Sequence, residues 1–452
     1  MKGTQKLAGG LLTVFALAAT AAGQPPVEPP APPPAPQAGS YMGPASCASS
    51  NCHGAVRPRR VFDVLQNEHF TWLKGGDRHY TAWRVLFNDR SRVIARNLDL
   101  PVPAPESPAC LGCHGFAVAK EKQTVSLEIE DGISCEACHG PAGGWIREHS
   151  AEGWSHQQSV TAGMTDLRDL EARSRLCLSC HLGAPGQTVD HELIAAGHPL
   201  LSFELDNYTE DMPAHWMPFR DKQRKEGLRD THGVRAWAVG QAASFRAGLD
   251  QLARRARSPR WPEFSEMSCD SCHHSLTEQR WKTLSNPERP GLPRWSPARW
   301  AVLRHLVTAV APDARDSLDA GVAQLTHQTA RFGNPPAEVA ETAERISRAL
   351  GDVASRLDRA AWDDAEVKSL LIAIAGDDGA FAVADPAAAE QAFLAFNSLV
   401  ARLQARNPRR VRAGLASTLE TMKKELDDPY TWNPVRFKSQ LAQLRKQAQG
   451  VP

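Results

Sequence analysis

Apolar residues recur at three- and four-residue intervals through the last third of the chain, from about Gly291 onwards. In one segment they are Phe393, Phe396, Leu399, Val400 and Leu403, and in another Val339, Ile346, Leu350, Val353 and Leu357. This spacing places apolar side chains on one face of an α-helix. Ser296 and Asp385 are capping residues that each precede a proline at a first helical position. About six or seven such segments predict a bundle or array of helical hairpins.

The preceding part of the chain has short apolar runs separated by loops. Helical spacing is found in Thr81 to Leu98 and in Arg235 to Leu252. Apolar and polar residues do not alternate over any long run, so we expect little sheet, with room for a short hairpin at Gln123 to Ile129. The predicted fold is mainly α, with a loop-rich domain at 41–288 followed by a C-terminal helical bundle at 289–452.

The N-terminus has the pattern of an export signal. Lys2 and Lys6 precede an uncharged, mostly apolar stretch with small residues around Ala19 to Ala21. A transmembrane anchor needs about 20 apolar residues, and this stretch is shorter and stops at a proline-rich segment. We therefore expect a cleaved signal peptide at 1–22, an extended Pro-rich linker at 23–40 and a periplasmic mature protein.

The charges of the chain nearly balance, with 52 Lys and Arg residues against 51 Asp and Glu residues. This balance argues against a nucleic-acid partner, and no polybasic segment marks a membrane surface. The cysteines and histidines, in contrast, are distributed unevenly along the chain. All ten cysteines and 14 of the 16 histidines precede residue 280.

All ten cysteines belong to one repeated motif, C-x-x-C-H, of which the first copy (CASSNCH) has four residues between its cysteines. The cysteine pairs are Cys47 and Cys52, Cys110 and Cys113, Cys135 and Cys138, Cys177 and Cys180, and Cys269 and Cys272. The histidines that follow them are His53, His114, His139, His181 and His273. C-x-x-C-H is the attachment signature of c-type haem: the thiols bind the porphyrin covalently and the histidine ligates the iron. The motifs therefore predict five covalent haem c groups.

Three other uses of cysteine fit this pattern less well. A disulfide framework gives no reason for a histidine after every second cysteine. Structural zinc needs four ligands, usually from two paired knuckles, and five sets of three ligands do not close in that way. A thioredoxin-like motif needs a strand–helix setting and would not recur five times.

Each haem iron has a second axial position, and eleven histidines remain outside the motifs. Only seven methionines are present and none recurs with the motifs, so two histidine ligands are favoured for most haems. His191 and His198 lie seven residues apart, about two helical turns, and could reach two neighbouring haems, such as those on His181 and His273. His232 is a reserve ligand. The histidines not assigned to iron are His156, His215, His274, His305 and His327.

Three segments are informative beyond the motifs: Tyr41 to Gly54, Asp77 to Ala82, and Asp131 to Glu148 with the following His149. They resemble the cytochrome c-554 family, whose members include a tetrahaem electron carrier. The resemblance covers roughly Tyr41 to Gly183 and four of the five attachment sites. Outside it, the segments VDHELIAAGHPLLSFEL and WPEF look like larger multihaem relatives.

The resemblance also implies distal ligands. His149 would ligate the haem on His53, and His79 would ligate the haem on His139. The family keeps one haem with an open or weakly held sixth position at its second motif, which here is the haem on His114. His69 could reach that iron and close it. The longer spacing of the first motif departs from the family.

These observations predict an electron carrier that works between a redox protein donor and a redox protein acceptor. Irons saturated by two histidines exchange electrons without binding substrate. Such a carrier could also associate peripherally with a membrane electron-transfer complex. The alternative is a reductase or oxidase of a small nitrogen or sulfur compound at one open haem. A third hypothesis makes the C-terminal helices a docking part of a larger complex.

Overall fold

The computed structural model describes residues 39–59, 64–124, 126–216, 232–273, 293, 295–330, 335–377, 386–406, 414–427 and 432–451. The predicted signal peptide at 1–22, most of the linker at 23–40 and His274 lie outside these ranges. The described chain is mainly helical, which confirms the predicted fold class. Its β-structure is limited to isolated bridges, such as that between Tyr41 and Gln123, so the hairpin expected at 123–129 is not formed by the described residues.

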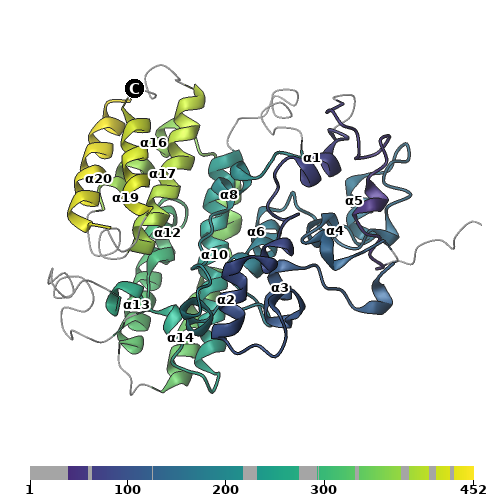
Figure 1. Ribbon diagram of the computed structural model, residues 1–452. Coiled ribbons are helices and arrows are strands. Elements are labelled where there is room, and N and C mark those ends of the chain that lie inside the picture. Colours follow the sequence, from purple (N-terminus) through teal and green to yellow (C-terminus); the bar gives the residue numbers. More distant parts are fainter. Residues whose placement is uncertain are drawn as a thin grey trace, which may run out of the picture. The chain divides into compact units, whose positions relative to one another are not determined.

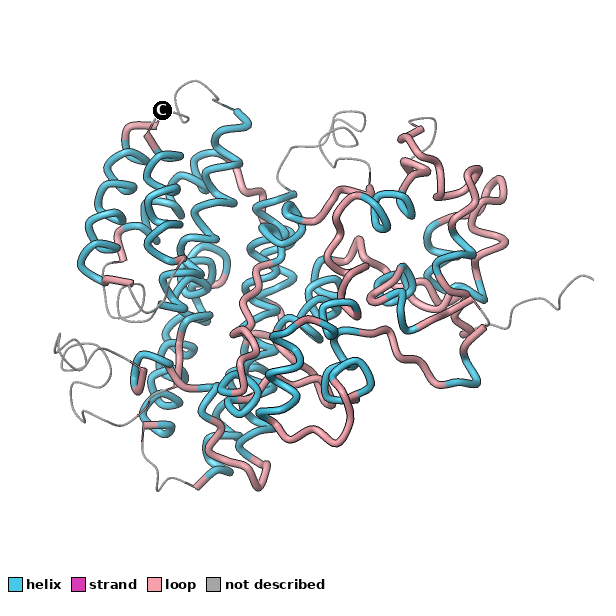
Figure 2. The backbone as a smooth tube through the Cα atoms, viewed as in Figure 1, coloured by secondary structure: helices cyan, strands magenta, loops and turns pink. Residues whose placement is uncertain are grey.

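The part of the chain that carries the motifs consists of short helices joined by long loops (Figure 2). The α-helices are α1 (Glu68–Lys74), α2 (Asp89–Asn97), α3 (Pro108–His114), α4 (Cys135–His139), α5 (His156–Thr161), α6 (Leu170–His181), α7 (His191–Ala195) and α8 (Leu205–Asp211). The 3₁₀ turns are η1 (Pro44–Cys47), η2 (Arg84–Phe87), η3 (Ala104–Glu106), η4 (Lys120–Lys122), η5 (Ile129–Asp131), η6 (Ala142–Gly144), η7 (Phe264–Glu266) and η8 (Cys269–Ser271). Three helices, α3, α4 and α6, end at a motif histidine. One turn of helix places the first cysteine, the second cysteine and the histidine of C-x-x-C-H on one face.

One predicted helix is divided in the structure. The segment at 81–98 forms the turn η2 and then the helix α2, because Asn88 between them has an extended backbone with ψ 169°. The Asn88 side chain accepts a hydrogen bond from the Ser91 backbone N–H at 2.8 Å and so caps α2. The apolar spacing is helical on both sides of Asn88, which is why the pattern alone indicated one continuous helix.

The later helices follow α10 (His232–Ala256), which several of them contact (Figure 1). They are α12 (Ala298–Val310), α13 (Pro312–Thr329), α14 (Pro336–Ala349), α15 (Val353–Arg359), α16 (Asp364–Ala375), α17 (Pro386–Arg406), α19 (Leu415–Leu426) and α20 (Pro434–Gln449). Four of them begin with proline, whose fixed φ suits the first helical position. No described helix has the length and apolar character needed to cross a bilayer.

The main apolar core includes α10 and the helices that follow it. Trp237 of α10 and Trp300, Trp362 and Trp432 of the later segments are all fully buried there. α10 contacts α6 and α8 as well as α12, α14, α15 and α17, so the core continues on both sides of residue 288. The division into domains at 288/289 stays a prediction. Among the described residues before Leu170, none belongs to this core, as expected if bound cofactors supply apolar surface there.

Candidate metal centre

The motif cysteines are free thiols, and thiols of different motifs lie next to one another. A hydrogen bond joins the side chains of Cys47 and Cys135, and another joins Cys113 and Cys180. The bond from Cys113 lowers the pKa of the Cys180 thiol to about 6, whereas burial raises the pKa of Cys138 to about 12. The attachment edges of the first and third motifs therefore adjoin, as do those of the second and fourth.

Four motif histidines each face one histidine from elsewhere in the chain. The ring centroids are 6.2 Å apart for His53 and His149, and 6.3 Å apart for His181 and His79, His114 and His198, and His273 and His191. The angles between the ring planes are 14°, 79°, 79° and 32° in the same order. The separation is thus constant while the orientation varies widely. Direct ring packing does not require one distance at every angle.

This separation fits two imidazoles on opposite sides of one metal ion. With a metal–nitrogen bond of about 2.0 Å and the nitrogen about 1.1 Å from the ring centroid, the two centroids lie about 6.2 Å apart. Among the described residues there is no cluster of three or more His, Cys, Asp or Glu side chains able to hold a bare ion. A pair of axial nitrogens is the ligand set that haem requires from a protein, because the porphyrin supplies the other four.

Hydrogen bonds orient the paired rings so that Nε2 is left for the metal. The Nδ1 atoms of His114, His149 and His198 lie 2.8 to 3.0 Å from the backbone carbonyls of Ala82, Ile146 and Pro199. A carbonyl only accepts, so each Nδ1 carries the proton and each Nε2 has a free lone pair. His156 and His305 have the opposite arrangement, because their Nε2 atoms are bonded to Asp166 and Asp377.

In two pairs a carboxylate takes the place of the carbonyl. Nδ1 of His53 lies 2.9 Å from Glu68, and Nδ1 of His79 lies 2.9 Å from Asp77. Burial works against ionisation of both carboxyl groups, but the hydrogen bonds outweigh it, so the pKa of each lies below its ordinary value. The hydrogen bond that His53 donates to Glu68 in turn raises the pKa of His53.

Burial keeps several of the rings neutral, which is the state that binds a metal. It lowers the pKa of His181 to about 4, with a further contribution from the facing His79. It also lowers the pKa of His114, and the charge of His198 acts in the same direction. A positive charge on His79 or His198 therefore disfavours protonation of the motif histidine that it faces.

Three of the expected ligand positions differ in the structure. His149 faces His53, as the resemblance implies, but His79 faces His181 rather than His139. His191 faces His273, one of the two partners considered, whereas His198 faces His114. Helix α7 ends at Ala195 and Gly197 has φ +118°, so His191 and His198 do not share a helix face. The chain turns between them and sends them to different motifs.

His69 does not lie opposite His114. Its ring packs against Trp72 at 5.6 Å, and its backbone N–H donates to the His53 carbonyl at 2.9 Å. Being the second residue of α1, it is oriented by that helix, whose neighbouring Glu68 reaches His53. The sequence spacing of His69 gave no information on this helix orientation.

His139 is the motif histidine that does not belong to the four facing pairs. Burial lowers its pKa to about 4, and the largest charge effect on it comes from His215. Nδ1 of His215 lies 3.3 Å from the Pro213 carbonyl, and burial lowers the pKa of His215 as well. The sequence pattern did not assign His215 to an iron. No spacing rule marks it, because its position depends on how α8 and the loop after it fold back toward α4.

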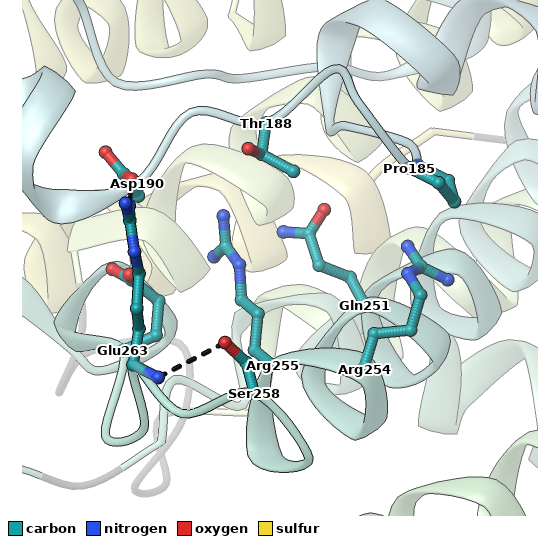
Figure 3. Close-up of a pocket in the computed structure, with 9 residues that line it drawn as sticks. Pro185, Thr188, Asp190, Gln251, Arg254, Arg255, Ser258 and Glu263 are labelled. Atoms are coloured by element: carbon teal, nitrogen blue, oxygen red, sulfur yellow. Dashed lines mark hydrogen bonds and ion pairs between the residues drawn. The ribbon is translucent and has the colours of Figure 1, made fainter.

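A polar cavity of about 260 Å³ is lined in part by Asp190, which directly precedes His191 in the chain (Figure 3). Its lining includes Arg254, Arg255 and Glu263, and the Glu263 carboxylate accepts the His191 backbone N–H at 2.9 Å. Phe264 packs its ring 5.9 Å from that of His191. The WPEF segment therefore positions His191, and the guanidinium groups beside it are of the kind that binds carboxylates such as haem propionates.

Comparison with known proteins bears on the first three motifs. Residues 46–140 match the family described as cytochrome c554 and c-prime. The match includes the motifs that end at His53, His114 and His139, and those that end at His181 and His273 lie beyond it. No curated protein and no solved structure matches the chain. The segment at 46–140 is thus similar to the cytochromes c554 and c-prime, which supports covalently bound haem c and a role in electron transfer.

Proposed function

We propose that this chain is a periplasmic pentahaem c-type cytochrome that carries electrons between redox proteins. The observation that supports it most is the set of four histidine pairs with ring centroids 6.2 to 6.3 Å apart, each containing one motif histidine. Bound haem supplies the one-electron change between ferric and ferrous iron. The chain supplies covalent attachment, axial nitrogens and a buried setting.

We assign the axial ligands as pairs of histidines. The pairs are His53 with His149, His114 with His198, His139 with His215, His181 with His79, and His273 with His191. In this assignment no iron keeps a position for substrate, which favours a carrier over an enzyme. His215 is assigned from its effect on His139 and from its Nδ1 hydrogen bond.

The arrangement of the thiols supports transfer between haems. Cys47 contacts Cys135 and Cys113 contacts Cys180, so two attachment motifs adjoin in each case. Cys138 is influenced by the charges of Cys177 and Cys180, which links the third and fourth motifs. We infer that the first four haems form one compact array. The pair formed by His191 and His273 places the fifth haem next to α7, which follows the fourth motif in the chain.

The periplasmic location is proposed from the N-terminal segment and from the cofactor. Lys2, Lys6 and the uncharged stretch that follows fit a cleaved export signal. The donor and acceptor are proposed to be redox proteins, and a peripheral association with a membrane electron-transfer complex is consistent with the 23–40 linker.

One observation favours a second candidate, a reductase or oxidase of a small nitrogen or sulfur compound. Among the described residues, no ring faces His139 at the separation seen for the other four motif histidines. In this alternative the haem on His139, rather than the haem on His114, has the exchangeable sixth position. The family's open position at the second motif is not expected here, because His198 lies opposite His114.

The two candidates are distinguished by ligand binding to the purified holoprotein. Intact mass first establishes how many haems are attached, and five are expected. Cyanide is then added to the oxidised protein and nitric oxide to the reduced protein, and the haem absorption bands are recorded. A carrier with five saturated irons shows no rapid change in either spectrum. Binding by one of the five haems supports the enzyme, and a His215→Ala variant, which should bind both ligands, is the positive control.

A further inference from the structure

Two of the paired histidines differ from the others in the group that accepts their Nδ1–H. His53 donates to Glu68 and His79 donates to Asp77, both at 2.9 Å. His114, His149 and His198 donate instead to neutral backbone carbonyls. The difference in charge divides three of the four facing pairs into two classes. The His53–His149 and His79–His181 pairs have one anionic acceptor each, and in the His114–His198 pair both rings have neutral acceptors.

Glu68 and Asp77 are held in position by further hydrogen bonds. One oxygen of Glu68 faces His53, and the other accepts the backbone N–H groups of Leu65 and Gln66 at 2.7 and 3.0 Å. Asp77 is 97% buried, being 3% exposed, and accepts both the backbone N–H and the ring Nδ1–H of His79. Both carboxylates are therefore fixed against their imidazoles rather than mobile on the surface.

A carboxylate at Nδ1 changes what the opposite ring nitrogen does. It draws the Nδ1 proton toward itself, which makes the imidazole more basic and a stronger donor at Nε2. A stronger donor favours ferric iron over ferrous iron, so the haem is harder to reduce. A neutral carbonyl has the same geometric effect on the ring with less transfer of electron density.

We propose that Glu68 and Asp77 are positioning residues that lower the reduction potentials of the haems on His53 and His181 below that of the haem on His114. This proposal rests on the proposed function, since it concerns haems held by these histidine pairs. Each low-potential haem adjoins another haem through a thiol contact, Cys47 with Cys135 or Cys113 with Cys180. Electrons that enter two adjoining haems therefore settle on the haem whose histidine has no carboxylate partner. This makes the haem on His114 a reservoir for the haem on His181.

The expected order is that the haems on His53 and His181 have the lowest reduction potentials and the haem on His114 has the highest.

The ring angles allow the haems to be told apart by electron paramagnetic resonance. Nearly parallel axial imidazoles give a rhombic low-spin ferric signal, and nearly perpendicular imidazoles give a strongly anisotropic low-spin signal. The rings of His53 and His149 lie at 14°, whereas those of His79 and His181 lie at 79°. A change at Glu68 should therefore affect the haem with a rhombic signal, and a change at Asp77 should affect a haem with a strongly anisotropic signal.

The test is a redox titration of the full-length holoprotein and three variants, followed by electron paramagnetic resonance. Glu68→Gln and Asp77→Asn keep a hydrogen-bond acceptor but remove its charge. Glu68→Gln should make one rhombic haem at least tenfold easier to reduce, about 59 mV for one electron. Asp77→Asn should do the same to one anisotropic haem. Asp166→Asn is the matched control, because Asp166 bonds the unassigned His156 at the same 2.9 Å, and should shift no haem.

The outcomes separate this proposal from the function on which it rests. A wild-type protein without haem would contradict the proposed function. Five haems with unchanged midpoints in Glu68→Gln and Asp77→Asn would overturn only the role of these two carboxylates, as would an equal shift in Asp166→Asn. Glu68→Asp, which keeps the charge, should retain a midpoint closer to the wild type than Glu68→Gln does. A purely structural role would alter haem content or spin state rather than the potential.

Discussion

At the scale of single residues, the atom that each histidine ring uses for its hydrogen bond decides whether it can ligate a metal. Nδ1 of His198 is bonded to the Pro199 carbonyl, so its Nε2 points free toward His114. Nε2 of His156 is bonded to Asp166, which occupies the atom that a haem iron would need. The two side chains are identical, but only His198 keeps the ring nitrogen that an iron would need free of a hydrogen bond to a carboxylate.

Replacing His198 by alanine should open the haem on His114. Loss of the sixth ligand leaves a five-coordinate or water-bound ferric iron, which is high-spin. We expect one high-spin ferric signal and tight cyanide binding at one haem of the five. His156→Ala is the matched control and should keep the wild-type spectrum. An unchanged low-spin spectrum in His198→Ala would show that His198 is not a ligand.

Glu204 should make stability depend on pH between about 4.5 and 7. Burial raises its pKa to about 7, and the nearby Asp206 acts in the same direction. Between these pH values the folded protein keeps a proton that the unfolded chain has lost, so the unfolding free energy falls as pH rises, by up to about 1.4 kcal/mol per pH unit. The unfolding temperature of the wild type should decrease as pH rises through this range, relative to the unfolding temperature of the Glu204→Gln variant. If the unfolding temperatures of the two proteins changed with pH in the same way, Glu204 would not be the source of the pH dependence.

At the scale of helices, α10 carries apolar residues around its whole circumference because other helices surround it. Gly240 permits one of these contacts: a Cβ at this position would lie 2.8 Å from the Cβ of Leu205, at the start of α8. Helix α8 contributes Tyr208, whose ring packs against His181. Gly240 therefore allows α8 to pack close to α10, and α8 in turn contacts the motif histidine His181.

Alanine at Gly240 should destabilise the protein although alanine favours helix. The gain in helix propensity is about 1 kcal/mol, and overpacking against Leu205 costs about 1 to 3 kcal/mol. Gly248→Ala, in the same helix, meets Arg299 no closer than 3.6 Å and should be neutral or stabilising. Chemical denaturation compares the two variants. If Gly240→Ala were as stable as Gly248→Ala, the packing of α8 on α10 would be wrong.

The sequence predicted the helices well, but it did not predict which histidine faces each motif histidine. A motif histidine is fixed by its two neighbouring cysteines, which is local information. His198 and His79 reach their partners through the loops after α7 and α1, so their positions depend on packing far along the chain. Asn88 divides one predicted helix because its backbone is extended and its side chain caps α2. The spacing of apolar residues does not indicate either feature.

At the scale of the whole molecule, the C-terminal helices bury the face of α10 that points away from the motifs. Trp237, Phe245 and Leu249 of α10 are buried in the same core as Trp300 and Trp362. Exposing an apolar side chain of this size costs about 1.5 to 3 kcal/mol. The haem-bearing part and the helical part therefore depend on each other for stability.

A chain truncated after residue 288 should fail to accumulate as a soluble holoprotein. Removing the later helices exposes Trp237, Phe245, Leu249 and their neighbours in one continuous apolar surface. Periplasmic expression followed by haem staining and size-exclusion chromatography measures this. A soluble fragment with the full haem content would instead support two independent domains divided at 288/289.

The most direct test of paired histidine ligation is electron paramagnetic resonance of the oxidised full-length holoprotein. The ring angles of 14° and 32° predict rhombic low-spin signals, and the two angles of 79° predict strongly anisotropic low-spin signals. We expect both kinds together, with no high-spin signal unless the haem on His139 is open. A spectrum dominated by high-spin ferric iron, or one without any haem signal, would contradict the account.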